Sequence, residues 1–216
     1  MDIIYLGHSS FRLRGKTASV VCDPFDSEIV GFKFPLVDAD VVTVSHDHKD
    51  HNQFMLVKNA QKVISGPGEY EISGVSIIGI PTFHDNKKGS LRGKNTIYVI
   101  EMDGLRIAHL GDLGHELSEK ILNQMGAIDI LMIPVGGEYT IGTAMATKVA
   151  RAVEPAIVIP MHYLVEGMNG ETFSKLVKVE PFLSDMGLPV ENLPKLSVKK
   201  TDIAEEKKIV VLERRD

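Results

Sequence analysis

The residues with the clearest chemical meaning form one short segment, SHDHKDH at residues 45–51, directly after the apolar run Val41–Val44. Side chains two positions apart in an extended chain point to the same face, so His46 and His48 can bind one ion. Asp50 and His51 follow where the chain turns away, and they can reach a neighbouring ion. Imidazole and carboxylate ligands suit zinc, manganese, iron or nickel, and the lack of cysteine ligands argues against a purely structural zinc site. The segment therefore predicts a loop that serves two metal ions.

Three further potential ligands, His84, Asp112 and His162, each lie just beyond an apolar segment that reads as a strand. Ligands gathered at the same ends of several strands are the usual way in which an α/β scaffold builds a site. The 45–51 loop alone would leave two coordination spheres unfilled. We therefore expect all three residues to be metal ligands.

The elements that must position these ligands follow from periodicity and from glycine and proline breaks. Strands are predicted first, and strands that alternate with helices come later. The predicted strands are Ile3–Leu6, Ser19–Cys22, Val41–Ser45, Val63–Ser65, Val75–Ile80, Thr96–Glu101, Arg106–His109, Ile128–Pro134 and Ala156–Pro160. The predicted helices are Glu116–Met125, Thr143–Val153 and Gly170–Val177. A final pair of strands, Leu196–Lys200 and Lys207–Glu213, is expected around the charged AEEKK turn. This order predicts two packed sheets with helices outside.

Composition narrows the class of protein. The 216 residues, 44% hydrophobic and 25% charged, predict one globular domain over residues 1–216. The net charge of −5 offers no basic field for nucleic acid, so a polynucleotide partner is not expected. No apolar run reaches the roughly 18 residues that span a membrane, and the first residues do not resemble a secretory signal. Cys22 is the single cysteine, which excludes an intrachain disulfide and fits a cytoplasmic location.

The order Asp23, His46-x-His48-x-Asp50-His51, His84, Asp112, His162 resembles the metallo-β-lactamase superfamily. The opening LGHSSF and the stretch HLGDLGH resemble its cytosolic branch, which includes ascorbate-6-phosphate lactonases and many metal-dependent hydrolases. The resemblance implies an αββα four-layer sandwich of two mixed β-sheets with helices outside and two divalent metal ions at one edge. Zinc is the first expectation for these ions, with manganese, nickel or iron as alternatives.

The resemblance also implies a role for each matching residue. The first metal would be bound by His46, His48 and His84, the second by Asp50, His51 and His162, with Asp112 bridging both. Asp23 would be an acid that hydrogen-bonds the ligand loop. His84 stands in an FHD context rather than the GHxxG of better-known members, so His109 is the alternative ligand. If His84 binds the metal, we expect His109 to support the ligands without binding the ion.

The expected chemistry is hydrolysis of a small anionic ester, lactone or phosphoester by a metal-bound hydroxide, with β-lactam hydrolysis as a side activity. Asp50 is the candidate to orient the water and pass its proton to the leaving group. His8 is either an electrophile or proton donor near the substrate, or a loop histidine bonded to backbone. Substrate contacts are hypothesised for Gly136, Gly137, Glu69 and Arg92, although a glycine pair after a strand is more often only a turn.

Two other classes of function stay open. A nuclease or phosphodiesterase on the same scaffold would need a basic track, which is not obvious in this sequence. A non-catalytic metal-binding protein would retain costly buried charges without use.

Two further enzyme classes are not favoured. A relative of glyoxalase II would need an additional helical domain, and a di-iron oxidoreductase would replace His48 with an acid. The sequence leaves the substrate and the native metal undetermined, and a homo-oligomer is possible.

Overall fold

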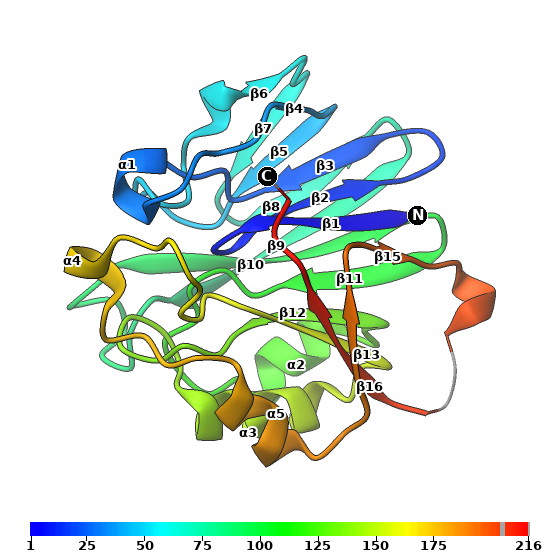
Figure 1. The fold of residues 1–216 in the computed structure, drawn as a ribbon. Coiled ribbons are helices and arrows are strands. Elements are labelled where there is room, and N and C mark those ends of the chain that lie inside the picture. Colours follow the sequence, from blue (N-terminus) through cyan, green and yellow to red (C-terminus); the bar gives the residue numbers. More distant parts are fainter. Residues whose placement is uncertain (204–205, 216) are drawn as a thin grey trace.

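The structure is a computed structural model that describes residues 1–203 and 206–215, and its centre is a pair of β-sheets packed face to face (Figure 1). The six-stranded sheet has the order β15 (Leu196–Ser197), β1 (Asp2–Gly7), β2 (Ser10–Arg14), β3 (Ser19–Cys22), β5 (Val41–Val44), β7 (Lys62–Ser65). The eight-stranded sheet has the order β14 (Val190–Leu193), β16 (Lys208–Leu212), β13 (Ile157–Met161), β12 (Ile130–Pro134), β11 (Leu105–His109), β10 (Lys94–Met102), β9 (Val75–Phe83), β8 (Gly68–Ile72). A small pair, β4 (Val37–Asp38) and β6 (Val57–Lys58), completes the strands.

Alternation along the strands determines which side chains fill the space between the two sheets. In β3, Val20 and Cys22 belong to the core that joins the sheets, whereas Val21 points to the outer face. From the opposite sheet, Tyr98 and Ile100 of β10 enter the same core. Because both faces of these strands are covered, the strands are apolar almost throughout.

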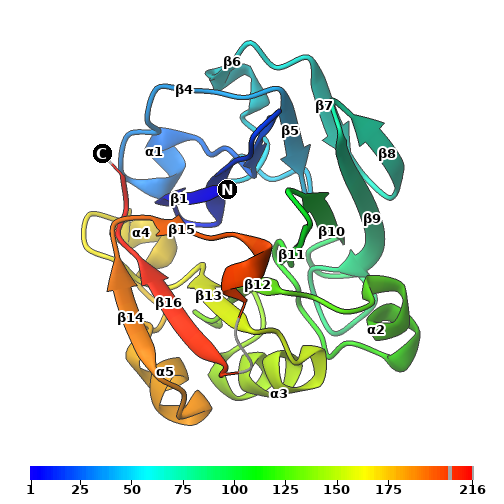
Figure 2. The ribbon, with the colours of Figure 1, turned by 90° about the vertical axis from the view of Figure 1, so that its right-hand side faces the viewer.

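Helices cover the outer faces of both sheets (Figure 2). The eight-stranded sheet packs against α2 (Glu119–Met125), α3 (Thr143–Val153) and α5 (Glu180–Met186). The six-stranded sheet is covered by the short helices α1 (Ser27–Val30) and α4 (Gly170–Phe173) and by the loops beside them. The result is the expected four-layer αββα sandwich, so the predicted fold class is confirmed.

Several predicted elements need correction. The two C-terminal strands do not pair with each other, because β15 joins β1 and β16 lies between β13 and β14. Residues 204–205 of the predicted turn lie outside the described residues. The predicted helix Glu116–Met125 begins at Glu119, since the Ser118 hydroxyl caps the Ile121 N–H. The predicted helix Gly170–Val177 ends at Phe173. The helices and strands that were not predicted are α1, α5, β2, β4, β6, β8 and β14.

The strand ends that carry the candidate ligands meet at one edge of the sandwich. Because β3, β5 and β7 run parallel, as do β11, β12 and β13, their carboxyl ends lie side by side. The residues that directly follow β1, β3, β5, β9 and β13 are His8, Asp23, Ser45, His84 and His162. The loop after β11 adds Asp112.

The longest described helix, α3, has 11 residues. Among the residues that the structure describes, no helix combines the length and the apolar character that a membrane span requires.

Tyr98 links the two sheets by hydrogen bonds close to the edge where the candidate ligands meet. Its hydroxyl donates to the Val44 carbonyl at 2.9 Å and accepts the Gly66 N–H at 2.8 Å. We predict that Tyr98→Phe lowers the free energy of unfolding by about 1–2 kcal/mol, because both backbone groups lose a buried partner. Urea unfolding measures this change. In the control Tyr163→Phe, the lost hydroxyl has no hydrogen bond among the described residues. An unchanged midpoint for Tyr98→Phe would contradict this role.

Candidate metal centre

One carboxylate oxygen, Oδ2 of Asp112, lies at the centre of the candidate site. Four histidine Nε2 atoms surround it, at 3.2 Å for His84, 3.3 Å for His51, 3.3 Å for His162 and 3.9 Å for His46. These side chains come from four separate loops at the strand ends. The histidine–aspartate cluster comprises these five residues together with His8, His48 and Asp50.

The loop that presents Asp112 is held tightly. Gly111 has φ +54°, and a Cβ there would overlap Asn95 and Ser45, so only glycine fits without displacing its neighbours. The Asp112 N–H donates to Asn95 Oδ1 at 2.9 Å, and Asn95 Nδ2 donates to the carbonyl of Leu110 at 3.0 Å. The carboxylate is therefore fixed by backbone geometry and by one buried amide.

The first group of potential ligands consists of His46, His48 and His84, whose ligand atoms lie within 4.8 Å of one another. The Nε2 atom of His46 and the Nδ1 atom of His48 are 3.0 Å apart. The Ser45 hydroxyl, 2.9 Å from His46 Nδ1, fixes the orientation of that ring. His46 and His84 are buried whereas His48 is exposed, so the group faces solvent on one side.

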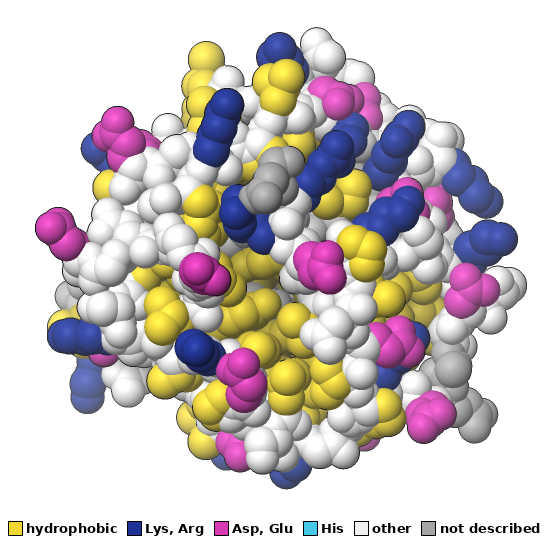
Figure 3. Space-filling model, in the orientation of Figure 1, with side chains coloured by type: hydrophobic (Ala, Val, Ile, Leu, Met, Phe, Trp, Pro, Cys, Tyr) yellow, Lys and Arg dark blue, Asp and Glu magenta, His cyan; other side chains and the backbone are white. Residues whose placement is uncertain are grey.

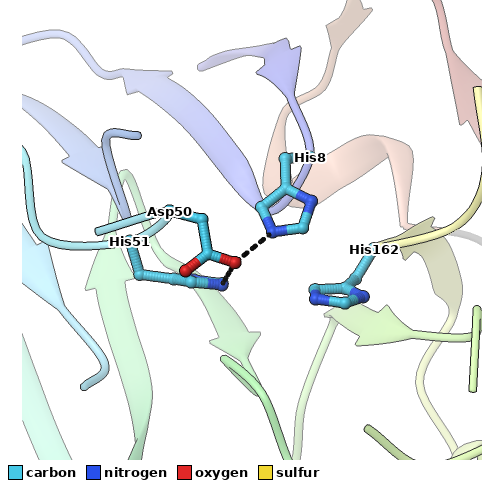
Figure 4. Close-up of side chains that lie close together, drawn as sticks. All are labelled: His8, Asp50, His51 and His162. Carbon is cyan, nitrogen blue, oxygen red and sulfur yellow. Dashed lines mark hydrogen bonds and ion pairs between the residues drawn. The ribbon is translucent and has the colours of Figure 1, made fainter. Parts of the chain in front are cut away.

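The second group consists of His8, Asp50, His51 and His162, also within 4.8 Å of one another (Figure 4). Asp50 Oδ2 is 3.2 Å from His8 Nε2 and 3.6 Å from His51 Nε2, as the dashed lines of Figure 4 show. The ring centroids of His8 and His162 are 4.3 Å apart. His8 is fully buried and has φ +55°, and its carbonyl accepts the His162 N–H at 2.9 Å.

The buried Asp23 links the two groups through its contacts with Ser45 and His51. Its Oδ1 accepts the Ser45 N–H at 2.8 Å, and its Oδ2 lies 2.5 Å from Ser45 Oγ and 2.9 Å from His51 Nδ1. One buried carboxylate thus orients His51 directly and His46 through Ser45. This is the arrangement by which acids behind metal ligands fix imidazole orientation.

The charges of the buried groups depend on one another. Burial lowers the pKa of His46 to about 3 and that of His8 to about 4, so both rings are neutral at pH 7. Burial alone would lower the pKa of His51, but the Asp112 and Asp50 carboxylates raise it well above its usual value. Burial alone would raise the pKa of Asp112, but His162 and His51 hold it well below its usual range. Burial alone would likewise raise the pKa of Asp50, but nearby groups, chiefly His51, lower it.

These residues fit divalent cations. The pKa values of Asp23, Asp50 and Asp112 are all lowered, so three negatively charged carboxylates lie close together at pH 7, beside His51, whose pKa is raised. Among the described residues, several buried cluster atoms have no hydrogen-bond partner, which is costly unless a ligand satisfies them: His51 Nε2, His84 Nδ1, Asp112 Oδ1 and both His162 ring nitrogens. Nitrogen and oxygen donors without thiolate suit zinc, manganese, iron or nickel.

None of the described histidines shows on the face of the molecule drawn in Figure 3.

The structure places His109 outside the cluster. Its Nε2 lies 2.8 Å from the carbonyl of Ser9, and its Nδ1 accepts the Gly111 N–H at 3.2 Å. Both ring nitrogens are thus occupied by backbone, and His109 supports the loop that presents Asp112. Of the two alternatives for the first group, the structure brings His84 to Asp112.

The four hypothesised substrate contacts lie in different surroundings. A Cβ on Gly136 would overlap the His162 carbonyl, so Gly136 allows close packing there, and Gly137 at φ +69° begins a turn. Glu69 is exposed on the edge strand β8, opposite Ile78, and within the described part of the chain it makes no contact with the cluster. Arg92 is half-buried, with its guanidinium carbon 5.6 Å from the centroid of the Tyr139 ring.

Several residues that shape the site were not singled out from the sequence. Ser45 lay within the motif, but its hydroxyl is informative only once Asp23 is known to lie opposite. Asn95 and Phe173 give no sequence signal, because their roles depend on the pairing of β9 with β10 and on the position of α4. Asp85, next to His84, had the best available signal as an acid directly after a candidate ligand.

Comparisons with known proteins agree on one family. A family model described as a β-lactamase superfamily domain matches residues 2–162. A relative from Thermococcus onnurineus, named a UPF0173 metal-dependent hydrolase, is 29% identical, with 82% of this chain and 92% of the relative covered. A relative of the same name from Thermoplasma acidophilum is 30% identical, with 76% and 83% covered.

Solved structures extend this likeness to the fold. A Thermotoga maritima protein, described as a candidate Zn-dependent hydrolase of the metallo-β-lactamase superfamily, superposes with a TM-score of 0.81 at 38% identity, covering 99% of each chain. A metallo hydrolase from Ignicoccus hospitalis shares the fold at 18% identity, with a TM-score of 0.66 over 100% of this chain and 96% of the other. The chain therefore belongs to the metallo-β-lactamase superfamily.

Proposed function

We propose that this chain is a metal-dependent hydrolase whose cluster binds two divalent cations, with zinc the first expectation. The observation that carries the proposal is the convergence of four imidazoles on the buried Asp112 carboxylate. We assign His46, His48 and His84 to one cation, Asp50, His51 and His162 to the other, and Asp112 to both. The relatives named metal-dependent hydrolases support the same reaction class.

We further propose that the substrate is a small anionic ester, lactone or phosphoester. When bound, divalent cations polarise the substrate oxygen and make a coordinated water more acidic. The side chain of Asp50 is 17% exposed, whereas those of Asp112 and His51 are almost completely buried, so Asp50 is the carboxylate that an entering water can reach. We assign Asp50 the task of orienting that water and passing its proton to the leaving group.

His8 acts in this proposal through Asp50. Because its ring is fully buried and neutral at pH 7, it is suited to donate its Nε2–H to Asp50 Oδ2 rather than to touch substrate. This contact keeps the carboxylate in one orientation.

The lone, buried Cys22 is compatible with a reducing cytoplasm, which we propose as the location.

We predict that the purified protein holds about two divalent ions per chain and that its affinity for them falls as the pH is lowered. The sign follows from His51, because its raised pKa means that a proton competes with the metal for Nε2. Metal analysis and competitive chelation at several pH values test both statements. An absence of bound ions after gentle purification, or tighter binding at low pH, would contradict them.

Asp50→Ala should lower kcat by at least about 100-fold, since the group that orients the water and carries its proton is removed. The matched control is Asp47→Ala, which removes an exposed acid from the same loop and should leave kcat within about twofold. Circular dichroism checks that both variants keep the fold. Undiminished turnover in Asp50→Ala would remove Asp50 from the mechanism.

His8→Phe should weaken binding of one of the two ions by about 10-fold or more, because Asp50 loses the hydrogen bond that orients it. His8→Gln, which keeps an N–H donor, should retain most of the affinity. Competitive chelation of each variant gives both values. Equal losses in the two variants would show that the donated hydrogen bond is not the cause.

A further inference from the structure

The loop of residues 86–93 is folded around one carboxylate. Asp85, which is 4% exposed and directly follows His84, accepts four backbone N–H groups. The donors are Lys87 at 2.7 Å, Gly89 at 2.9 Å, Leu91 at 3.0 Å and Arg92 at 2.8 Å. Because the Arg92 N–H reaches back to Asp85, the loop returns to the neighbour of a candidate metal ligand. The backbone of Arg92 is therefore fixed beside the first ligand group.

Two aromatic rings, those of Tyr139 and Phe173, lie between the guanidinium of Arg92 and the second ligand group. The guanidinium lies over the Tyr139 ring, and that ring meets Phe173 edge-on with centroids 6.1 Å apart. The Phe173 ring in turn lies 5.0 Å from His8 and 6.4 Å from His162, measured between centroids. The Tyr139 hydroxyl donates to the Thr172 carbonyl at 2.5 Å, which fixes the ring. The backbone of Arg92 is thus tied to the neighbour of His84, and its guanidinium is linked to His8 and His162 through the rings of Tyr139 and Phe173.

The positive charge of Arg92 has no acidic partner. Among the residues that the structure describes, no carboxylate forms an ion pair with its guanidinium, although the side chain is half-buried. Lys87 and Lys88 in the same loop, and Lys94 at the start of β10, are exposed and add positive charge nearby. A half-buried cation held in place without a counter-ion favours an anion supplied by a ligand. A guanidinium suits phosphate or carboxylate, because its planar fork donates two parallel hydrogen bonds.

We infer that Arg92, held over Tyr139 by the loop around Asp85, binds a phosphate or carboxylate group of the substrate while the bond to be broken lies at the histidine–aspartate cluster. This inference rests on the proposed function and narrows its substrate class. The scissile ester and the anionic group are separate parts of one small molecule. Arg92 is a specificity residue and takes no part in bond cleavage.

The test compares three 4-nitrophenyl esters that share a leaving group: the neutral butyrate, the hemisuccinate with a carboxylate, and the 3-phosphonopropionate with a phosphonate. Arg92→Met should raise KM for one or both anionic esters at least about 10-fold and leave the butyrate within about twofold. Arg92→Lys should fall between wild type and Arg92→Met. Whichever anionic ester shows the larger change identifies the recognised group.

The matched control is Lys87→Met, which removes an exposed charge from the same loop and should change no KM by more than about twofold. Metal content and melting temperature show whether each variant is intact, and Arg92→Gln replaces Arg92→Met if the latter unfolds. Equal changes for all three esters, or an equal effect of Lys87→Met, would overturn the inference.

A binding measurement separates failure of the inference from failure of the proposed function. 3-Phosphonopropionate and succinate are titrated calorimetrically into the metal-loaded wild type and into Arg92→Met. Binding of either anion that weakens at least about fivefold in Arg92→Met supports the subsite even if wild type hydrolyses no ester, and then the proposed reaction fails alone. Binding of both anions that is unaltered by Arg92→Met refutes the subsite, whatever the activity.

Discussion

The site depends on one constraint, the burial of the Asp112 carboxylate within reach of several imidazoles. A buried carboxylate must be compensated, and here His51 and His162 approach it at 3.3 Å. Three carboxylates with lowered pKa values lie together in the cluster, and this concentration of negative charge is suited to divalent cations. The packed sheets, the glycine before Asp112 and the acid behind the ligand loop all hold this carboxylate in place.

The two sheets contribute differently to the site. The six-stranded sheet supplies the continuous loop 45–51, whereas the eight-stranded sheet supplies isolated ligands at the ends of β9, β11 and β13. The cluster therefore forms only when the sheets pack in one register. Tyr98, which reaches from one sheet to the end of β5 in the other, is part of what sets that register. The Tyr98 contacts that stabilise the packing of the sheets and the candidate metal ligands therefore lie at the same edge of the sandwich.

Much of this was predictable from the sequence, because strand ends and ligand types are local properties. The strand before 45–51 is a short apolar run and the helix Thr143–Val153 has a clear helical period, and the structure contains both. The pairing of β15 with β1 was missed, since a two-residue strand is defined only by its partner. The interactions of His109 with backbone and of His8 with Asp50 also escaped prediction, because they join segments far apart in the chain.

The most direct test is a crystal structure of the metal-loaded protein with anomalous scattering data collected at the absorption edge of the bound metal. The account predicts two peaks about 3.5–4 Å apart on either side of the Asp112 carboxylate. One of these peaks should lie among His46, His48 and His84, and the other among Asp50, His51 and His162. Peaks away from these side chains, or no peak at all in protein shown by elemental analysis to contain metal, would contradict it.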